Sequence, residues 1–232
     1  FPDVPIIYVA GNHEFYGQDF SVINLMRKVA EELDIYFLEN DEVVIGDIRF
    51  LGCTLWSDFN KFNTKTIENA LMNDYKAISC KSWWDIEENK ERALKLIGNI
   101  FDKRSLPQLM FSPIIAYITH QDSMLWLEKK LGEEFDGKTV VVTHHAPSFQ
   151  SAYNQFKDAA LLYCYCSDLE DFIKNNDIDF WFHGHLHQPS NYKIGSTEIV
   201  SNSKGYPTRV ANPKIYDGEH CQDFNAKLLI EV

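Results

Sequence analysis

The sequence predicts a mixed α/β fold for this chain of 232 residues. Runs of β-branched and apolar residues, typical of strands buried on both faces, alternate with segments whose apolar residues recur at helical spacing. Several of these strand-like runs end in a turn that carries histidine beside small or polar residues. Two-residue turns between short strands add antiparallel hairpins. Alternation of this kind is typical of helices that pack on a sheet.

The first hundred residues supply a strand, a helix and a hairpin. Residues 1–10 read as a linker and strand, and residues 35–37 as a further short strand. Between them, Phe20, Ile23, Met26, Ala30 and Leu33 recur at helical spacing, so an amphipathic helix that covers the sheet is expected, with Asp19 as its N-cap. Gly46-Asp47 separates two apolar runs within residues 43–55, which predicts a hairpin with a two-residue turn.

Residues 60–131 change to a helical pattern, which predicts a helical insertion. We expect helices over residues 66–75, from a capping box at residues 85–88 to about residue 101, and from residue 119 to about residue 132. His120 would enter the third helix with a local hydrogen bond. The insertion carries five aromatic residues: Trp83, Trp84, Phe111, Tyr117 and Trp126. They either select the leaving group of a substrate or form the insertion's own core.

The last third of the chain returns to strands. Residues 140–143 form a buried strand, and a loop over residues 148–166 follows, which is either a substrate loop or a plain connection. A capping box at residues 167–170 starts a helix, residues 178–182 form the next strand, and Gly195-Ser196 joins a hairpin. Residues 227–232 are expected to close a final strand.

Three turns carry the chemistry, and each follows a strand. The first contains Asn12-His13-Glu14, the second His144-His145, and the third runs from His183 to His187. In an extended backbone, residues i and i+2 point to the same side, so His185 and His187 have the spacing of metal ligands. His183 shares this parity but lies inside the strand, as a wall or supporting residue. The alternative for the third turn is a solvated loop.

The three turns together resemble a known family. Gly11-Asn12-His13-Glu14, His144-His145-Ala146-Pro147 and Gly184-His185-Leu186-His187 are similar, in this order, to the last three motifs of the calcineurin-like metallophosphoesterase superfamily. Residues 52–59 and 202–206 resemble segments of its bacterial and phage-type members; Lys204 in the second either touches substrate phosphate or sits in a surface turn. The resemblance implies a β-sandwich flanked by helices, as a single domain over residues 1–232 with the helical cap at about 60–131.

The resemblance also implies a dinuclear metal site. Asn12, His144 and His185 would bind one divalent ion and His187 the other, with Mn, Fe, Zn or Ni as candidates. His144 is preferred to His145 because it directly follows the strand, although either could be the ligand. The two ions would activate a hydroxide for attack on a phosphate mono- or diester. His13 would be the general acid that protonates the leaving group, supported by a carboxylate partner.

One departure from the family pattern matters. No Asp-x-His motif precedes Gly11, and the chain's Gly46-Asp47 is predicted to be a hairpin turn rather than a Gly-Asp-x-x-Asp motif. The chain starts at Phe1 and enters a strand directly, so we expect that an N-terminal βαβ segment is missing. The 232 residues would then bind one metal weakly and hydrolyse little, whereas the complete protein would be a phosphoesterase.

Composition narrows the partners and the rival functions. The formal net charge of −12 disfavours nucleic acid and so disfavours a DNA exonuclease of the related repair type. A metal-free binding scaffold is the other alternative, although a scaffold has no need of four ligand residues together with a general acid. A small phosphate ester or a nucleotide is the expected substrate. With five cysteines, no leader and no apolar run of membrane-spanning length, reduced thiols in the cytoplasm are expected.

Overall fold

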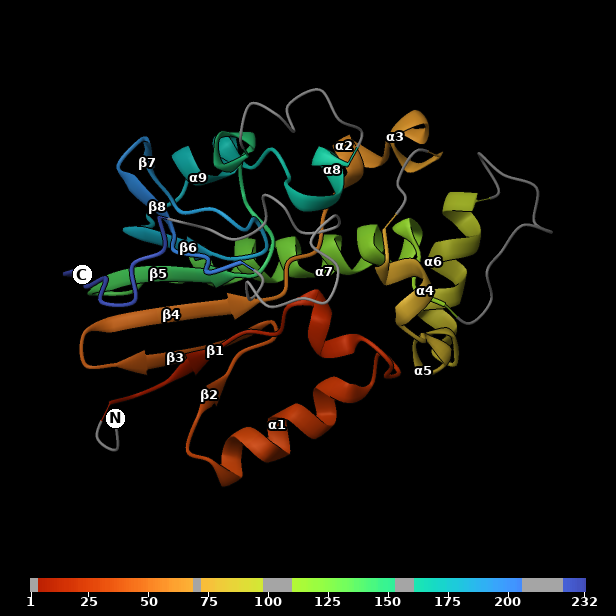
Figure 1. Cartoon of the computed structure of the whole chain (residues 1–232), viewed down its shortest axis with the longest axis horizontal. Helices are drawn as coiled ribbons and strands as arrows, with labels where there is room; N and C mark the ends of the chain where they lie inside the picture. Colours follow the sequence, from red (N-terminus) through yellow and green to blue (C-terminus); the bar gives the residue numbers. More distant parts are fainter. Residues whose placement is uncertain (1–3, 69–71, 98–109, 153–160, 206–222) are drawn as a thin grey trace.

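The described strands form a two-stranded sheet and a larger, six-stranded sheet, with helices packed around the larger one (Figure 1). The computed structural model describes residues 4–68, 72–97, 110–152, 161–205 and 223–232. The larger sheet has the strand order β3-β4-β5-β6-β8-β7. Its strands are β3 (Asp41–Ile45), β4 (Ile48–Cys53), β5 (Lys138–Thr143), β6 (Phe180–His183), β7 (Ser190–Ile194) and β8 (Thr197–Ser201). The smaller sheet pairs β1 (Ile7–Tyr8) with β2 (Tyr36–Phe37) in parallel.

Strand direction brings three loops to one edge. β4, β5, β6 and β8 run parallel, whereas β3 and β7 pair antiparallel with their neighbours. The carboxyl ends of β4, β5 and β6 therefore meet at the same edge of the sheet. The two predicted hairpins are confirmed, because Gly46 (φ 66°) and Gly195 (φ 61°) make the left-handed turns between β3 and β4 and between β7 and β8.

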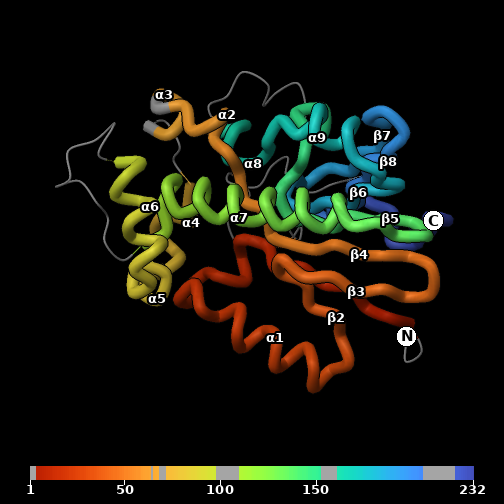
Figure 2. Tube along the Cα trace, turned by 180° about the vertical axis from the view of Figure 1, so that it is seen from behind, coloured from red at the N-terminus to blue at the C-terminus, as the bar shows by residue number. Residues whose placement is uncertain are grey.

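Helices flank this sheet, which confirms the predicted α/β class. The α-helices are α1 (Val22–Glu32), α2 (Phe59–Phe62), α3 (Thr64–Glu68), α4 (Asp74–Ala77), α5 (Lys81–Trp84), α6 (Glu87–Ile97), α7 (Pro113–Leu131), α8 (Leu162–Tyr165) and α9 (Glu170–Lys174). Two 3₁₀ turns are η1 (Asn12–Phe15) and η3 (Phe149–Ser151). α1 lies beside β1 and β2, and the long α7 connects the α4–α6 group to the sheet, as Figure 2 shows from behind.

Two larger hydrophobic cores hold these layers together, and a smaller third one consists of Ala146, Ala152, Leu162, Cys166 and Leu186. One of the larger cores lies on a face of the larger sheet, where Leu51, Val141, Trp181 and Ile199 stand side by side on β4, β5, β6 and β8. Leu127 of α7 and Ile173 of α9 close this core. The other core joins α1, η1 and the helices between residues 59 and 118. Trp83 and Phe111 are buried in it, as the packing alternative for the insertion's aromatics predicts.

Several predicted helix starts are wrong. Ser21 is the N-cap residue of α1, and the Asp19 carboxylate instead accepts hydrogen bonds from Ser21 and Ser82. α7 begins at Pro113 rather than residue 119, because the Ser112 hydroxyl caps it and proline favours a first helical position. His120 therefore lies inside α7. Its Nδ1–H donates a hydrogen bond, 3.1 Å long, to the carbonyl of Leu55, which is 65 residues away in the sequence.

Other boundaries also differ from the sequence prediction. The predicted helix over residues 66–75 is two elements, α3 and α4, with residues 69–71 outside the described part. α6 begins at Glu87, whereas Asp85 ends α5, and its predicted end near residue 101 lies outside the described residues. Leu169, not Ser167, is the N-cap residue of α9, because the Ser167 hydroxyl accepts a hydrogen bond from the Asp58 backbone. Residues 227–232 form no strand, and Leu33 is exposed at the end of α1.

Glu39 makes the stability of this fold depend on pH. Its Oε2 accepts hydrogen bonds from the backbone and the hydroxyl of Thr54, at 2.9 and 2.6 Å, and burial raises the pKa of Glu39 to about 7. Between the unfolded pKa and pH 7, the folded chain keeps a proton that the unfolded chain releases, so the free energy of unfolding falls as pH rises through this range. Replacing Glu39 with Gln removes this loss.

We therefore expect Glu39→Gln to stabilise the protein more at pH 8 than at pH 5. The difference should be about 1–2 kcal/mol after allowance for partial solvent exposure, which is about 2–8 °C in melting temperature for a chain of this size. Thermal unfolding of both proteins at the two pH values measures it, with the exposed Glu31→Gln as the control. An equal shift at both pH values would contradict the expectation.

Candidate metal centre

The loops after β4, β5 and β6 are joined to each other by backbone hydrogen bonds. The His145 N–H donates to the Thr54 carbonyl at 3.2 Å, and the Gly184 N–H donates to the His144 carbonyl at 3.1 Å. Trp181 of β6 donates its indole N–H to the Thr143 hydroxyl at 2.9 Å. These bonds fix the carboxyl ends of the three strands relative to one another, so side chains on the loops start from a rigid base.

Three predicted ligand residues meet at this edge. His144 Nε2 lies 3.0 Å from Asn12 Oδ1 and 3.0 Å from His185 Nδ1. The rings of His144 and His185 stand edge to face, with centroids 4.8 Å apart. We call Asn12, His144 and His185 the donor cluster. Its members come from three turns that are up to 173 positions apart in the sequence, from Asn12 to His185.

The backbone reaches this arrangement through conformations that a sequence pattern does not show. His185 has a φ of 62°, in the left-handed region, and residues 185–188 form bends. The extended geometry assumed for His185 and His187 is therefore wrong, because the left-handed residue changes the direction of the chain after β6. A left-handed conformation is uncommon for residues other than glycine. Where it does occur, it is often at a functional site.

Asp74 is a part of the site that the sequence did not reveal. Its Oδ1 accepts a hydrogen bond from Asn12 Nδ2 at 2.8 Å, and both residues are buried. Burial raises the pKa of Asp74, although the hydrogen bond from Asn12 and the nearby His13 oppose the rise. No local signal marks this residue, because a single aspartate at the start of a four-residue helix has no motif around it.

The histidines of the donor cluster are held neutral. Burial, followed by the charges of neighbouring histidines, keeps the pKa of His144 and that of His185 well below the usual range. His187 is one of these neighbours for both residues, so it lies within electrostatic range of them. A neutral imidazole offers a nitrogen lone pair, which is the form that binds a metal ion.

His13 and Glu14 follow Asn12 in η1. η1 makes the first turn helical, and the His13 ring is exposed and stacks on Tyr16, with centroids 4.5 Å apart and planes 17° apart. Glu14 lies in the same 3₁₀ turn, η1. It turns back, and its carboxylate accepts the Gly11 N–H at 2.8 Å.

The other histidines near the edge have different roles. His145 Nδ1–H donates to the Thr54 carbonyl at 3.2 Å, and burial lowers the pKa of His145 to about 3. His183 Nδ1–H donates to the Gly184 carbonyl at 3.0 Å, and its Nε2 accepts from the Ser151 hydroxyl at 2.8 Å. Both rings are held by these partners outside the donor cluster. The His145 ring packs against His185 with centroids 4.4 Å apart, but His144 is the residue whose Nε2 lies within hydrogen-bond distance of both Asn12 and His185.

The donor cluster fits part of the coordination shell of one divalent ion. Two ligands bound at right angles with metal bonds of about 2.1 Å lie about 3.0 Å apart, which matches both separations from His144 Nε2. One carboxamide oxygen and two imidazoles suit first-row metals. Three protein ligands leave positions open, as in catalytic sites. Within the described residues, no group of three or more His, Cys, Asp or Glu side chains is arranged to hold a metal ion.

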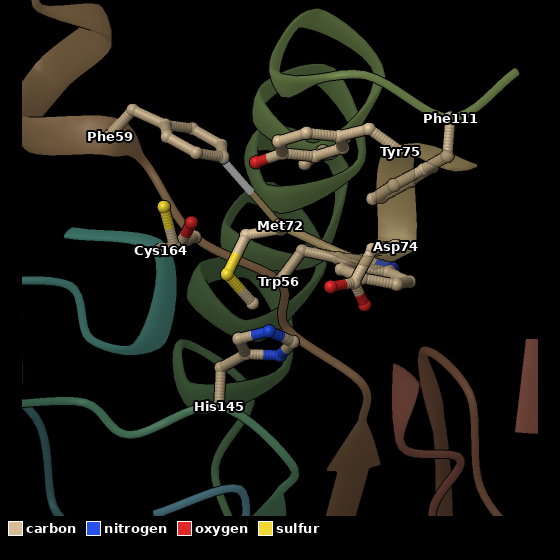
Figure 3. A pocket seen from close by; sticks show the side chains of 10 residues that line it. Trp56, Phe59, Met72, Asp74, Tyr75, Phe111, His145 and Cys164 are labelled. Atoms are coloured by element: carbon tan, nitrogen blue, oxygen red, sulfur yellow. The ribbon is translucent and has the colours of Figure 1, made fainter. Parts of the chain in front are cut away.

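A small cavity borders the site on the side of the helical insertion (Figure 3). Its volume is about 10 Å³, close to the smallest that holds one water molecule. The residues that line it are Trp56, Ser57, Phe59, Met72, Asp74, Tyr75, Phe111, Ala116, His145 and Cys164. Asp74 lines this space, and its Oδ2 is buried without a hydrogen-bond partner among the described residues. The walls are mostly aromatic or apolar, with Ser57, Asp74 and His145 as the polar residues.

Fold and site together define the class of protein: an α/β protein with histidine-bearing loops at the carboxyl ends of parallel strands. The chain belongs to the calcineurin-like phosphoesterase family, because residues 1–189 match that family's sequence profile. The sequence-based assignment is thereby confirmed. Among the described residues, no helix is both long and apolar enough to span a membrane.

Two known proteins are similar to this chain. "Uncharacterized protein L509" of Acanthamoeba polyphaga mimivirus is 26% identical over 219 residues, which are 87% of this chain and 68% of that protein. The crystal structure of phosphopantetheinyl hydrolase (PptH) from Mycobacterium tuberculosis superposes with a TM-score of 0.57 and 16% identity, covering 88% of this chain and 70% of that one. The second similarity is one of fold alone.

Proposed function

We propose that this chain carries the metal centre of a phosphoesterase that hydrolyses phosphate mono- or diesters. The observation that carries the proposal is the donor cluster, in which Asn12 Oδ1 and His185 Nδ1 both lie 3.0 Å from His144 Nε2. The family membership of residues 1–189 supports it. The proposal includes one domain over residues 1–232 with a helical cap at about 60–131.

In the proposal, Asn12, His144 and His185 hold one divalent ion, and His187 serves a second. Divalent ions at such a site lower the pKa of water and neutralise charge on phosphoryl oxygens. Neutral His144 and His185 are ready to bind without first losing a proton. Mn, Fe, Zn and Ni all suit these ligands. A small phosphate ester or a nucleotide is the proposed substrate, since the net charge of −12 disfavours nucleic acid.

His13 is the proposed general acid. As the ester P–O bond breaks, the leaving oxygen takes a proton from the His13 imidazolium, which becomes neutral. Three features support this role: the ring is exposed, it is braced by Tyr16, and it follows Asn12 directly in the chain. Asp74 lies within electrostatic range of His13 and offers the carboxylate that such an acid needs nearby.

The test is Mn²⁺ binding and phosphodiesterase activity of the purified 232-residue chain with bis-p-nitrophenyl phosphate. We expect a low rate that disappears with a chelator and returns with Mn²⁺, because the chain supplies four of the ligand positions implied by the family motifs. His13→Gln should keep Mn²⁺ binding and lose at least tenfold in rate, since general acids typically contribute 10²–10⁴-fold. If the unsubstituted chain neither binds Mn²⁺ nor hydrolyses the substrate, a metal-free binding scaffold is favoured instead.

A further inference from the structure

We infer that Asp74 is a positioning residue, which turns the Asn12 carboxamide so that its oxygen faces His144 and His185. The inference rests on the proposed function of the donor cluster and adds a residue from the helical insertion to it. Asp74 contacts the Nδ2 end of the Asn12 amide, at 2.8 Å, whereas His144 contacts the Oδ1 end. Among the described residues, no hydrogen bond joins Asp74 to His144 or His185.

The chemistry of an amide explains the need for such a residue. The oxygen and nitrogen ends of a carboxamide have nearly the same shape, and neighbouring groups decide which end faces which way. Only the oxygen offers a lone pair to a cation. Asp74 Oδ1 accepts the hydrogen bond from Asn12 Nδ2, so the NH₂ end of the amide faces Asp74 and the oxygen of Asn12 faces His144.

The surrounding fold holds Asp74 in place for this contact. The exposed fraction is 2% for Asp74 and 4% for Asn12, so water does not compete for the bond. The Gly17 N–H donates to the Ala77 carbonyl at 2.7 Å, which ties the last residue of α4 to the segment after η1. The Ser79 N–H donates to the Gln18 carbonyl at 2.9 Å. α4 and η1 therefore form one hydrogen-bonded unit, and the insertion is coupled to the first ligand turn.

The decisive variant is Asp74→Leu, measured by Mn²⁺ titration calorimetry and by thermal unfolding. Leucine has nearly the same size and shape, and its neighbours Met72, Tyr75 and Phe111 are apolar or aromatic. We expect the Mn²⁺ dissociation constant to rise about 10–100-fold, the usual effect of removing a group that supports a metal ligand. Asp74→Asn, whose carbonyl can still accept from Asn12, should restore most of the affinity. Cys164→Ala, in the wall of the same cavity, should leave the affinity unchanged.

The outcomes separate this inference from the proposed function. If the unsubstituted chain binds no Mn²⁺, the proposed function fails. If it binds Mn²⁺ and Asp74→Leu binds equally well, the positioning role is overturned while the function stands. Should Asp74→Leu not fold, the side-chain amide protons of Asn12 in the unsubstituted chain decide: slow exchange with water supports the bond to Asp74, and exchange as fast as that of the exposed Asn24 overturns it.

Discussion

Replacing His185 with Ala is expected to weaken Mn²⁺ binding at least 100-fold, which is about 2.7 kcal/mol or more. His185 Nδ1 is one of the three converging donor atoms, and its Nε2 is buried with no hydrogen-bond partner among the described residues. Alanine removes the donor and leaves His144 with Asn12 alone. Titration calorimetry or cobalt absorption spectroscopy measures the change directly, and the loss should be larger than that for any variant of Asp74.

His183→Gln is the matched control for this result. It removes a histidine two positions away in the same turn, and the new amide oxygen can accept the hydrogen bond from Ser151. We expect Mn²⁺ affinity close to that of the unsubstituted chain. Equal losses of Mn²⁺ affinity for the two variants would show that the turn as a whole, rather than the ring of His185, governs binding. The proposal that the donor cluster binds the metal ion would then fail.

Gly11→Ala is also expected to weaken the site, with a loss of about tenfold or more in Mn²⁺ affinity. A Cβ atom at Gly11 would lie 2.6 Å from His144 Cε1 and 2.8 Å from its Nδ1, closer than atoms approach without movement. The ring of His144 is the group that must move, and it carries the central donor atom of the cluster. Sub-ångström displacement of a ligand ring is sufficient to weaken a metal site.

Gly184→Ala tests whether this effect is specific. The same methyl group at Gly184 would lie 3.5 Å from His144 Nδ1, an ordinary van der Waals contact. We expect Mn²⁺ affinity within about threefold of the original and a similar melting temperature. Measuring both alanine variants by calorimetry and thermal unfolding therefore compares a clashing methyl group with a non-clashing one near the same ring. A harmless Gly11→Ala would mean that His144 has more freedom than its contacts indicate.

Predictions from local patterns were confirmed where short-range physics decides the structure. The hairpins at Gly46-Asp47 and Gly195-Ser196 follow from glycine in a two-residue turn between apolar strands. The buried strand before His144 follows from an unbroken β-branched run. Helix starts failed more often. The predicted start of α7 at residue 119 was wrong because the preceding Ser112-Pro113 pair is a stronger local signal. The predicted N-cap of α1 at Asp19 was wrong because the Asp19 carboxylate accepts a hydrogen bond from Ser82, in another element.

The order and composition of the three ligand turns were readable from the sequence, because each turn directly follows a strand and its residues are contiguous. Which atoms meet was decided only in three dimensions. Oδ1 of Asn12 faces His144 because Asp74, 62 residues later, takes the other end of the amide. His185 enters the donor cluster through a positive φ, whereas His183, of the same parity, bonds to Ser151. Contacts between distant segments depend on how the sheet and insertion pack, and no local periodicity encodes them.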